Sequence, residues 1–183
     1  MKQGNLTFIP MQLSLMDKLN KQDNQQSKQL SRLQKEMKSI SQIELSYKVG
    51  KALIEFPKIT CSQDCVDALR ESWDAGKIEF VEQFKVVLLN RANRILGIYE
   101  LSTGGVSGTV ADPKLVFSAA LLACASGIIL SHNHPSGSLS PSAADIQATK
   151  KMKEAGKLLD IEVLDHVILT AEGYYSFADN GEI

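Results

Sequence analysis

The feature that most constrains this fold is a short apolar segment, residues 127–131, that runs directly into polar residues. From residue 127 the sequence reads Gly-Ile-Ile-Leu-Ser-His-Asn-His-Pro-Ser-Gly. A short apolar run with a polar end is typical of a buried strand that delivers side chains to a site at its carboxyl end. Two of the chain's three histidines, His132 and His134, stand at this point.

The two histidines and a nearby carboxylate have the composition of a metal site. Residues i and i+2 of an extended segment point the same way, so His132 and His134 can present two imidazoles to one point. After a loop shaped by Gly and Pro, the chain enters a predicted helix whose first turn holds Asp145. Two imidazoles and one carboxylate, with a fourth position left open, are the ligand set of a catalytic zinc. We therefore predict a metal centre at His132, His134 and Asp145.

A structural interpretation of the same residues stays open. Ser142-x-x-Asp145 is close to a capping box, and a turn rich in Ser, Gly and Pro needs no metal. However, unpaired imidazoles at the end of a buried strand are costly, and this favours the metal site.

A carboxylate also stands in an unexpected place. On the predicted strand over residues 80–89, the face that carries Phe80 and Phe84 also carries Glu82. A buried carboxylate requires a partner, and a water activated by a metal is one, with Glu82 as the general base. A sheet edge, or a pairing of Glu82 with Lys or Arg, is the alternative.

Length and composition limit the function classes. A chain of 183 residues with 44% hydrophobic side chains can build one packed domain and a tail. The 20 basic and 21 acidic residues leave a net charge of -1, so no overall basic field holds a polyanion. The longest apolar run, residues 116–130, is shorter than the ~20 residues of a membrane span. With no export signal and three cysteines, we expect a soluble cytoplasmic protein without membrane association.

The first 41 residues differ from the rest. The first 50 residues carry 8 basic and 4 acidic side chains, whereas the other 133 carry 12 and 17. Leu30, Leu33, Met37 and Ile40 recur at spacings of three and four, which predicts one apolar stripe on a helix over residues 27–40. This helix would dock on its own domain or on a second subunit, as in a homodimer; a nucleic-acid or membrane arm is the alternative.

Residues 1–24 have too little apolar periodicity to predict order. The alternation of apolar and polar residues over 43–49 is typical of a half-buried strand, so we place the start of the folded domain there. The predicted organisation is a helical or partly disordered extension over 1–41 and one domain over 42–183.

The spaced set Glu82, His132-x-His134, Ser142 and Asp145 resembles the signature of the JAMM metalloproteins. Three shorter motifs are similar to the bacterial RadC-like JAB branch: His-Asn-His-Pro-Ser-Gly from residue 132, Pro141-Ser142, and Leu164-Asp165-His166. The resemblance covers roughly residues 79–183. It implies an α/β fold in three layers, with a mixed β-sheet between helices. It also implies zinc on the two histidines and Asp145, Glu82 as acid and base, and Ser142 as the hydroxyl that steadies an oxyanion.

Two functions are compatible with this resemblance. The first is a zinc hydrolase of amide, peptide or isopeptide bonds that acts on a protein or peptide. The second is a DNA-associated repair or mobile-element accessory protein, although residues 1–41 lack the helix-hairpin-helix pattern common in RadC-like proteins. His166 would be either a core residue or a partner that orients the metal ligands.

Overall fold

The computed structural model of the chain describes residues 9–37, 56–105 and 108–183. Contacts within the chain divide it into two units, Met1–Glu44 and Leu45–Ile183. The predicted domain start near residue 42 and the predicted strand over 43–49 lie outside the described residues.

The N-terminal unit contains one long helix, α1 (Ile9–Met37). Leu30 and Leu33 of the predicted stripe are exposed on it. The helix begins well before the predicted start at residue 27, so the expectation of no order up to residue 24 was wrong from Ile9 onward. Two features account for the early start: Pro10 suits a first helical turn, and the segment is rich in Leu, Met, Gln and Lys, which are good helix formers.

The second unit is built on a mixed five-stranded sheet with the order β2-β1-β3-β4-β5. Its strands are β1 (Gln83–Leu89), β2 (Ile95–Thr103), β3 (Gly127–Asn133), β4 (Glu162–Leu169) and β5 (Tyr174–Ser176). The pairing of β3 with β4 is parallel, and the other three pairings are antiparallel. β3 is the central strand, and all seven of its residues are buried, as its apolar sequence predicts.

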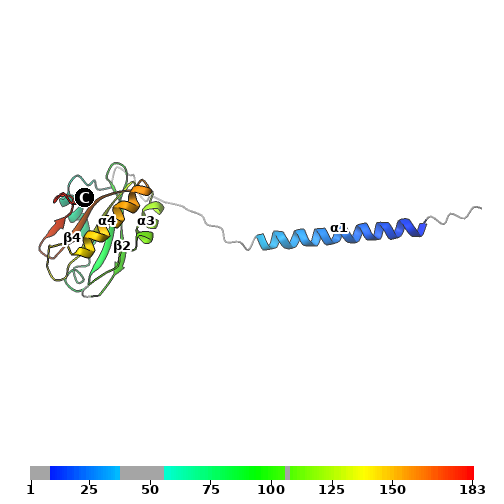
Figure 1. Ribbon diagram of the computed structural model, residues 1–183, viewed down its shortest axis with the longest axis horizontal. Coiled ribbons are helices and arrows are strands. Elements are labelled where there is room, and N and C mark those ends of the chain that lie inside the picture. The colour runs from blue at the N-terminus through cyan, green and yellow to red at the C-terminus, as the bar shows by residue number, and fades with distance from the viewer. Residues whose placement is uncertain (1–8, 38–55, 106–107) are drawn as a thin grey trace, which may run out of the picture. The chain divides into compact units, whose positions relative to one another are not determined.

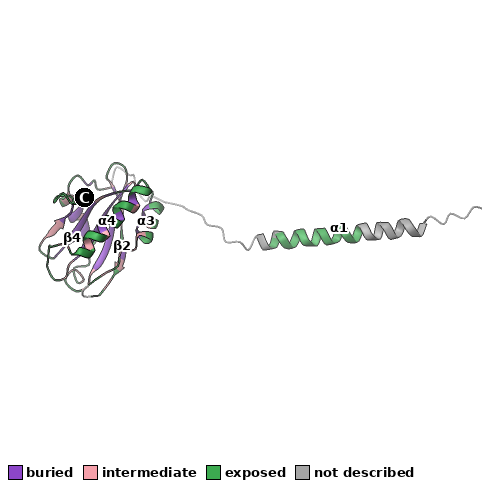
Figure 2. Cartoon of the chain, in the orientation of Figure 1, coloured by how far each residue is buried: buried purple, intermediate pink, exposed green. Residues whose placement is uncertain are grey.

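Helices cover both faces of this sheet, which confirms the predicted three layers. Helix α2 (Ser62–Ser72) packs on one face through Cys65, Val66 and Leu69. Helices α3 (Pro113–Leu122) and α4 (Ala143–Leu158) pack on the other face, as Figure 1 shows. The strands are largely buried, while the outer sides of the helices are exposed (Figure 2). Within the described ranges, no helix is long and apolar enough to cross a membrane.

Candidate metal centre

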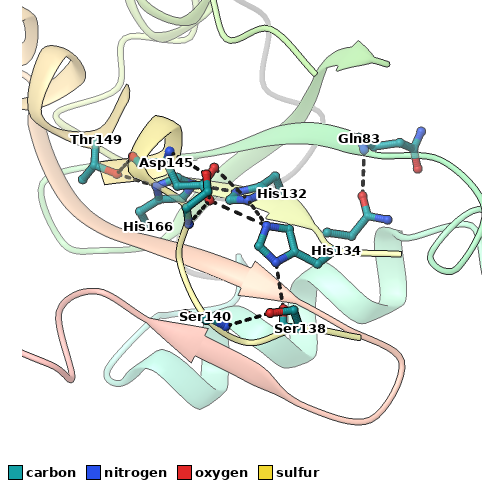
Figure 3. Close-up of polar contacts among 10 residues, drawn as sticks. Gln83, His132, His134, Ser138, Ser140, Asp145, Thr149 and His166 are labelled. Carbon is teal, nitrogen blue, oxygen red and sulfur yellow. Dashed lines mark hydrogen bonds and ion pairs between the residues drawn. The ribbon is translucent and has the colours of Figure 1, made fainter. Parts of the chain in front are cut away.

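The carboxyl end of β3 and the first turn of α4 bring His132, His134 and Asp145 together. The Nε2 atoms of the two histidines lie 3.0 Å apart. Asp145 Oδ1 is 3.2 Å from His132 Nε2, and Asp145 Oδ2 is 3.7 Å from His134 Nε2. Figure 3 shows the three side chains directed at one point. Of all the described residues, these three form the one group of His, Cys, Asp and Glu side chains close enough to share a metal ion.

The hydrogen bond on the far side of His134 fixes which ring nitrogen carries its proton. His134 Nδ1 lies 2.7 Å from the carbonyl oxygen of Ser138 (Figure 3). A carbonyl oxygen can only accept a hydrogen bond, so Nδ1 carries the proton. In the neutral ring, the Nε2 lone pair is then free and faces His132 and Asp145.

A chain of buried hydrogen bonds fixes the proton of His132 in the same way. The Thr149 hydroxyl donates to the Asp145 carbonyl at 2.7 Å. Its oxygen must therefore accept from His166 Nδ1, which is 2.6 Å away. His166 Nε2 is left as an acceptor for His132 Nδ1 at 2.9 Å. His132 thus holds its proton on Nδ1, and its Nε2 lone pair points at the site.

His166 is well suited to this role because it is completely enclosed. It is fully buried, and its ring stacks on Phe177. Burial lowers the pKa of His166 well below the usual histidine value, so the ring is neutral and has one proton to donate. His166 is therefore both a core residue and the partner that orients His132, so the two alternatives from the sequence combine.

With both rings neutral, the outcome is a convergence of three acceptors that have no proton between them. Two nitrogen lone pairs and a carboxylate oxygen face one another at 3.0 to 3.7 Å. Such an arrangement is repulsive unless a metal ion or a proton lies among the three groups. Two imidazoles and one carboxylate are a suitable donor set for a divalent metal, so the residues fit the predicted ion.

Asp145 is held in place by the start of its own helix. Ser142 is the N-cap of α4, and its backbone N–H and its hydroxyl donate to Asp145 Oδ2 at 2.7 and 2.6 Å. The capping box is therefore present, and it leaves Oδ1 facing His132. Burial alone would raise the pKa of Asp145. Hydrogen bonds that His132 and His134 donate when a proton occupies Nε2, together with those from Ser142, outweigh burial and hold this pKa well below its usual value, so the carboxylate is ionised.

The site opens to solvent on one side only. His132 is almost fully buried, whereas about 15% of the His134 side chain and 14% of the Asp145 side chain are accessible. The protonated form of His134 can donate from Nε2 to Asp145, and this hydrogen bond is the main cause that raises the pKa of His134; the charges of Asp145 and Glu82 raise it more weakly. The site is therefore accessible to solvent at His134 and Asp145.

The predicted strand around Glu82 was partly wrong. β1 begins at Gln83, so Glu82 precedes the strand, and it is half-buried rather than enclosed. Phe80, predicted to share its core face, is 67% exposed. The pairing of β1 with β3 ends at Phe84 and His132, two residues away from Glu82 and from His134, and the charge of Glu82 contributes to the raised pKa of His134. The backbone of Glu82 is fixed by hydrogen bonds with Gly104 and Gly105.

Sequence reasoning missed two residues at this site and left one undecided. Thr149 was not singled out, although it stands four residues after Asp145 and hence on the same face of α4. Asn133, between the two histidines, was overlooked because its side chain points away from them. His166 was left undecided because it reaches His132 only through the packing of β4 beside β3, which the local sequence does not show.

Comparisons with known proteins agree with the geometry of the site. A family model described as the RadC-like JAB domain matches residues 59–182. A UPF0758 protein of Flavobacterium johnsoniae is 45% identical over 129 residues, which are 70% of this chain and 55% of that protein. A UPF0758 protein of Porphyromonas gingivalis is 46% identical over 101 residues, 55% of this chain and 44% of that protein. The chain thus spans about half the length of the curated relatives it matches.

Proposed function

The chain belongs to the RadC-like JAB domain family, and from this premise we propose that it is a zinc-dependent hydrolase of amide, peptide or isopeptide bonds. The observation that carries the proposal is the convergence of two imidazole nitrogens and a carboxylate from His132, His134 and Asp145. A closed structural zinc site has four protein ligands, whereas this group has three. Three ligands and an open side are typical of hydrolytic centres.

Zinc is the ion that best suits this donor set. Imidazole nitrogens and one carboxylate suit zinc, whereas Mg²⁺ and Ca²⁺ favour oxygen ligands throughout. Bound by the three side chains, zinc would supply a Lewis acid that makes water acidic and polarises a substrate carbonyl. The relay through His166 and Thr149 keeps the His132 lone pair available for this ion.

Glu82 would act as the acid and base of the reaction. Two observations support this role: Glu82 is two residues before the pair of Phe84 with His132, and its charge contributes to the raised pKa of His134. It would take the proton of the attacking water and later pass it to the leaving amine.

Ser142 would contribute the hydroxyl that stabilises the oxyanion. Its proton is directed at Asp145 Oδ2, so this role requires the hydroxyl to rotate towards the substrate. The backbone N–H of Ser142 would keep Asp145 in place during that rotation.

The test is hydrolysis of internally quenched peptides and of lysine-linked isopeptides, with products identified by mass spectrometry. We expect cleavage that stops on chelation, returns with added zinc and is absent from Glu82→Gln. Lys85→Met, on the opposite face of the sheet, is the matched control and should remain active. Cleavage that persists without metal, or in Glu82→Gln, would overturn the proposal.

A further inference from the structure

Asn133 stands between the two histidine ligands but faces the other side of the sheet. Successive side chains of a strand point to opposite faces, so Asn133 points away from His132 and His134. It is completely buried, and every hydrogen-bonding group of its amide has a partner. All of these partners belong to the segment that leads into β1, residues 78–83.

The contacts of Asn133 continue the sheet beyond the end of the strand pairing. The register of β1 with β3 ends at Phe84 and His132. Beyond this pair, the backbone N–H of His134 donates to the Leu169 carbonyl of β4 and not to β1. The side chain of Asn133 takes the place of the missing backbone partner: its Oδ1 accepts from the Gln83 N–H at 2.7 Å.

The same amide also holds the loop before β1. Asn133 Nδ2 donates to the carbonyl oxygens of Ile78, at 2.7 Å, and Val81, at 2.9 Å. Glu82 lies between Val81 and Gln83, so both of its chain neighbours are fixed to Asn133. A single side chain thereby connects the ligand-bearing strand to the segment that carries the proposed base.

We propose that Asn133 is a positioning residue that sets the distance between Glu82 and the metal ligands. This inference rests on the proposed function, because it concerns the base of that reaction. No other side chain type of this size offers one acceptor and two donors in one plane. An Asp at this position would still accept from the Gln83 N–H, but its second oxygen would face the carbonyl oxygens of Ile78 and Val81 and be repelled by them.

The first test is amide hydrogen exchange of residues 78–83 in the full chain. Asn133→Ala and Asn133→Asp should both speed exchange of this segment at least about tenfold, because its anchoring hydrogen bonds are lost. Ser131→Ala is the matched control: it changes a fully buried residue on the same strand and the same face, and Ser131 Oγ has no partner among the described residues. Unchanged exchange of residues 78–83 in both Asn133 variants would overturn the inference.

The second test separates positioning from a general structural role, with Co²⁺ as the probe. Cobalt affinity should stay within about threefold of the parent in Asn133→Ala, since the ligands are untouched. The visible spectrum of bound Co²⁺ should change in Asn133→Ala as it does in Glu82→Gln. The variant that combines both substitutions should show no further change. Additive spectral changes, or loss of cobalt in Asn133→Ala, would overturn the inference while the proposed function stands. A parent protein that binds no cobalt would overturn both.

Discussion

His132 and His134 point to the face of the sheet covered by α3 and α4, while Ser131 and Asn133, which alternate with them along β3, point to the face covered by α2. On the α2 face, Asn133 bonds three backbone groups and Lys85 Nζ donates to the Ser72 carbonyl at 2.8 Å, although Ser131 Oγ has no partner among the described residues. On the histidine face, two neutral imidazole nitrogens and a carboxylate meet, and only a metal ion or an added proton can lie between them. Both faces are polar, but only the histidine face brings three acceptors to one point.

The contrast shows that burial of polar residues is not in itself a sign of function. A polar group whose donors and acceptors are paired within the chain stabilises the fold. A cluster of imidazoles whose Nδ1 protons are hydrogen-bonded away from the site directs its Nε2 lone pairs to one point, and this arrangement suits a cation. The predictions below test this difference between the two faces, in order of decreasing effect.

Removal of ligands on the histidine face should abolish metal binding. The double variant His132→Ala with Asp145→Ala leaves one imidazole, which cannot hold the ion alone. Elemental analysis should find about one zinc per chain in the parent and none in the variant. Full zinc content in the double variant would show that the ion binds elsewhere.

Loss of the proposed base, Glu82, should lower the rate of hydrolysis without affecting metal binding. Glu82→Gln should keep zinc and thermal stability, because Glu82 is half-buried outside the ligand set. Its rate should fall by about 10²- to 10⁴-fold, the usual contribution of a general base. Steady-state rates and zinc content of one preparation provide the check, and a variant that retains the parent rate contradicts the role of Glu82.

As the pH is lowered, metal affinity should begin to drop at a higher pH than it would with an ordinary histidine ligand. The Asp145 hydrogen bond raises the pKa of His134 above 6.5, so protons compete with the metal at a higher pH. Affinity should drop by about tenfold per unit below that pKa. In the metal-free protein, the raised pKa of His134 contributes stability that is present below pH 6.5 and is lost as the pH rises through this raised pKa. Zinc titrations between pH 5.5 and 8 measure the first trend; a flat profile contradicts it.

A change on the α2 face should affect stability alone. Lys85 is 4% exposed, and its ammonium lies over the Trp73 ring. Lys85→Met keeps the packing volume but removes the hydrogen bond to Ser72, at a cost of about 1–3 kcal/mol. Urea denaturation should detect this loss while zinc content stays constant. If zinc is lost along with stability, the two faces are not independent.

The smallest effect should come from the N-terminal unit. Both core clusters of the described residues are built from residues 59–183, without α1. Deletion of residues 1–41 should therefore shift the Tm of the domain by less than about 2 °C. If α1 docks on a second subunit, as its exposed Leu30 and Leu33 suggest, the truncated protein should also elute as a smaller species. A large loss of Tm would show that α1 stabilises the domain.

The sequence predicted the ligands better than the residues around them. His132 and His134 are two apart on a strand, and Asp145 begins a helix, so local spacing was sufficient to expect their convergence. The position of Glu82 depends on where β1 begins, and alternation alone extended that strand too far, to the exposed Phe80. Thr149 and His166 act through a strand pairing and a helix packing that link distant parts of the chain. Local periodicity carries no information about such contacts.

The most direct test of the account is the location of the histidine protons, measured by long-range ¹H–¹⁵N NMR of the side chains. The chain has only three histidines, so each ring can be assigned from single His→Gln variants. We predict that in the zinc-bound protein His132, His134 and His166 all carry their proton on Nδ1. Zinc removal should shift the Nε2 signals of His132 and His134 far more than that of His166. A proton on Nε2 of His132 or His134 in the presence of zinc, or no response of either ring to the metal, would contradict the account.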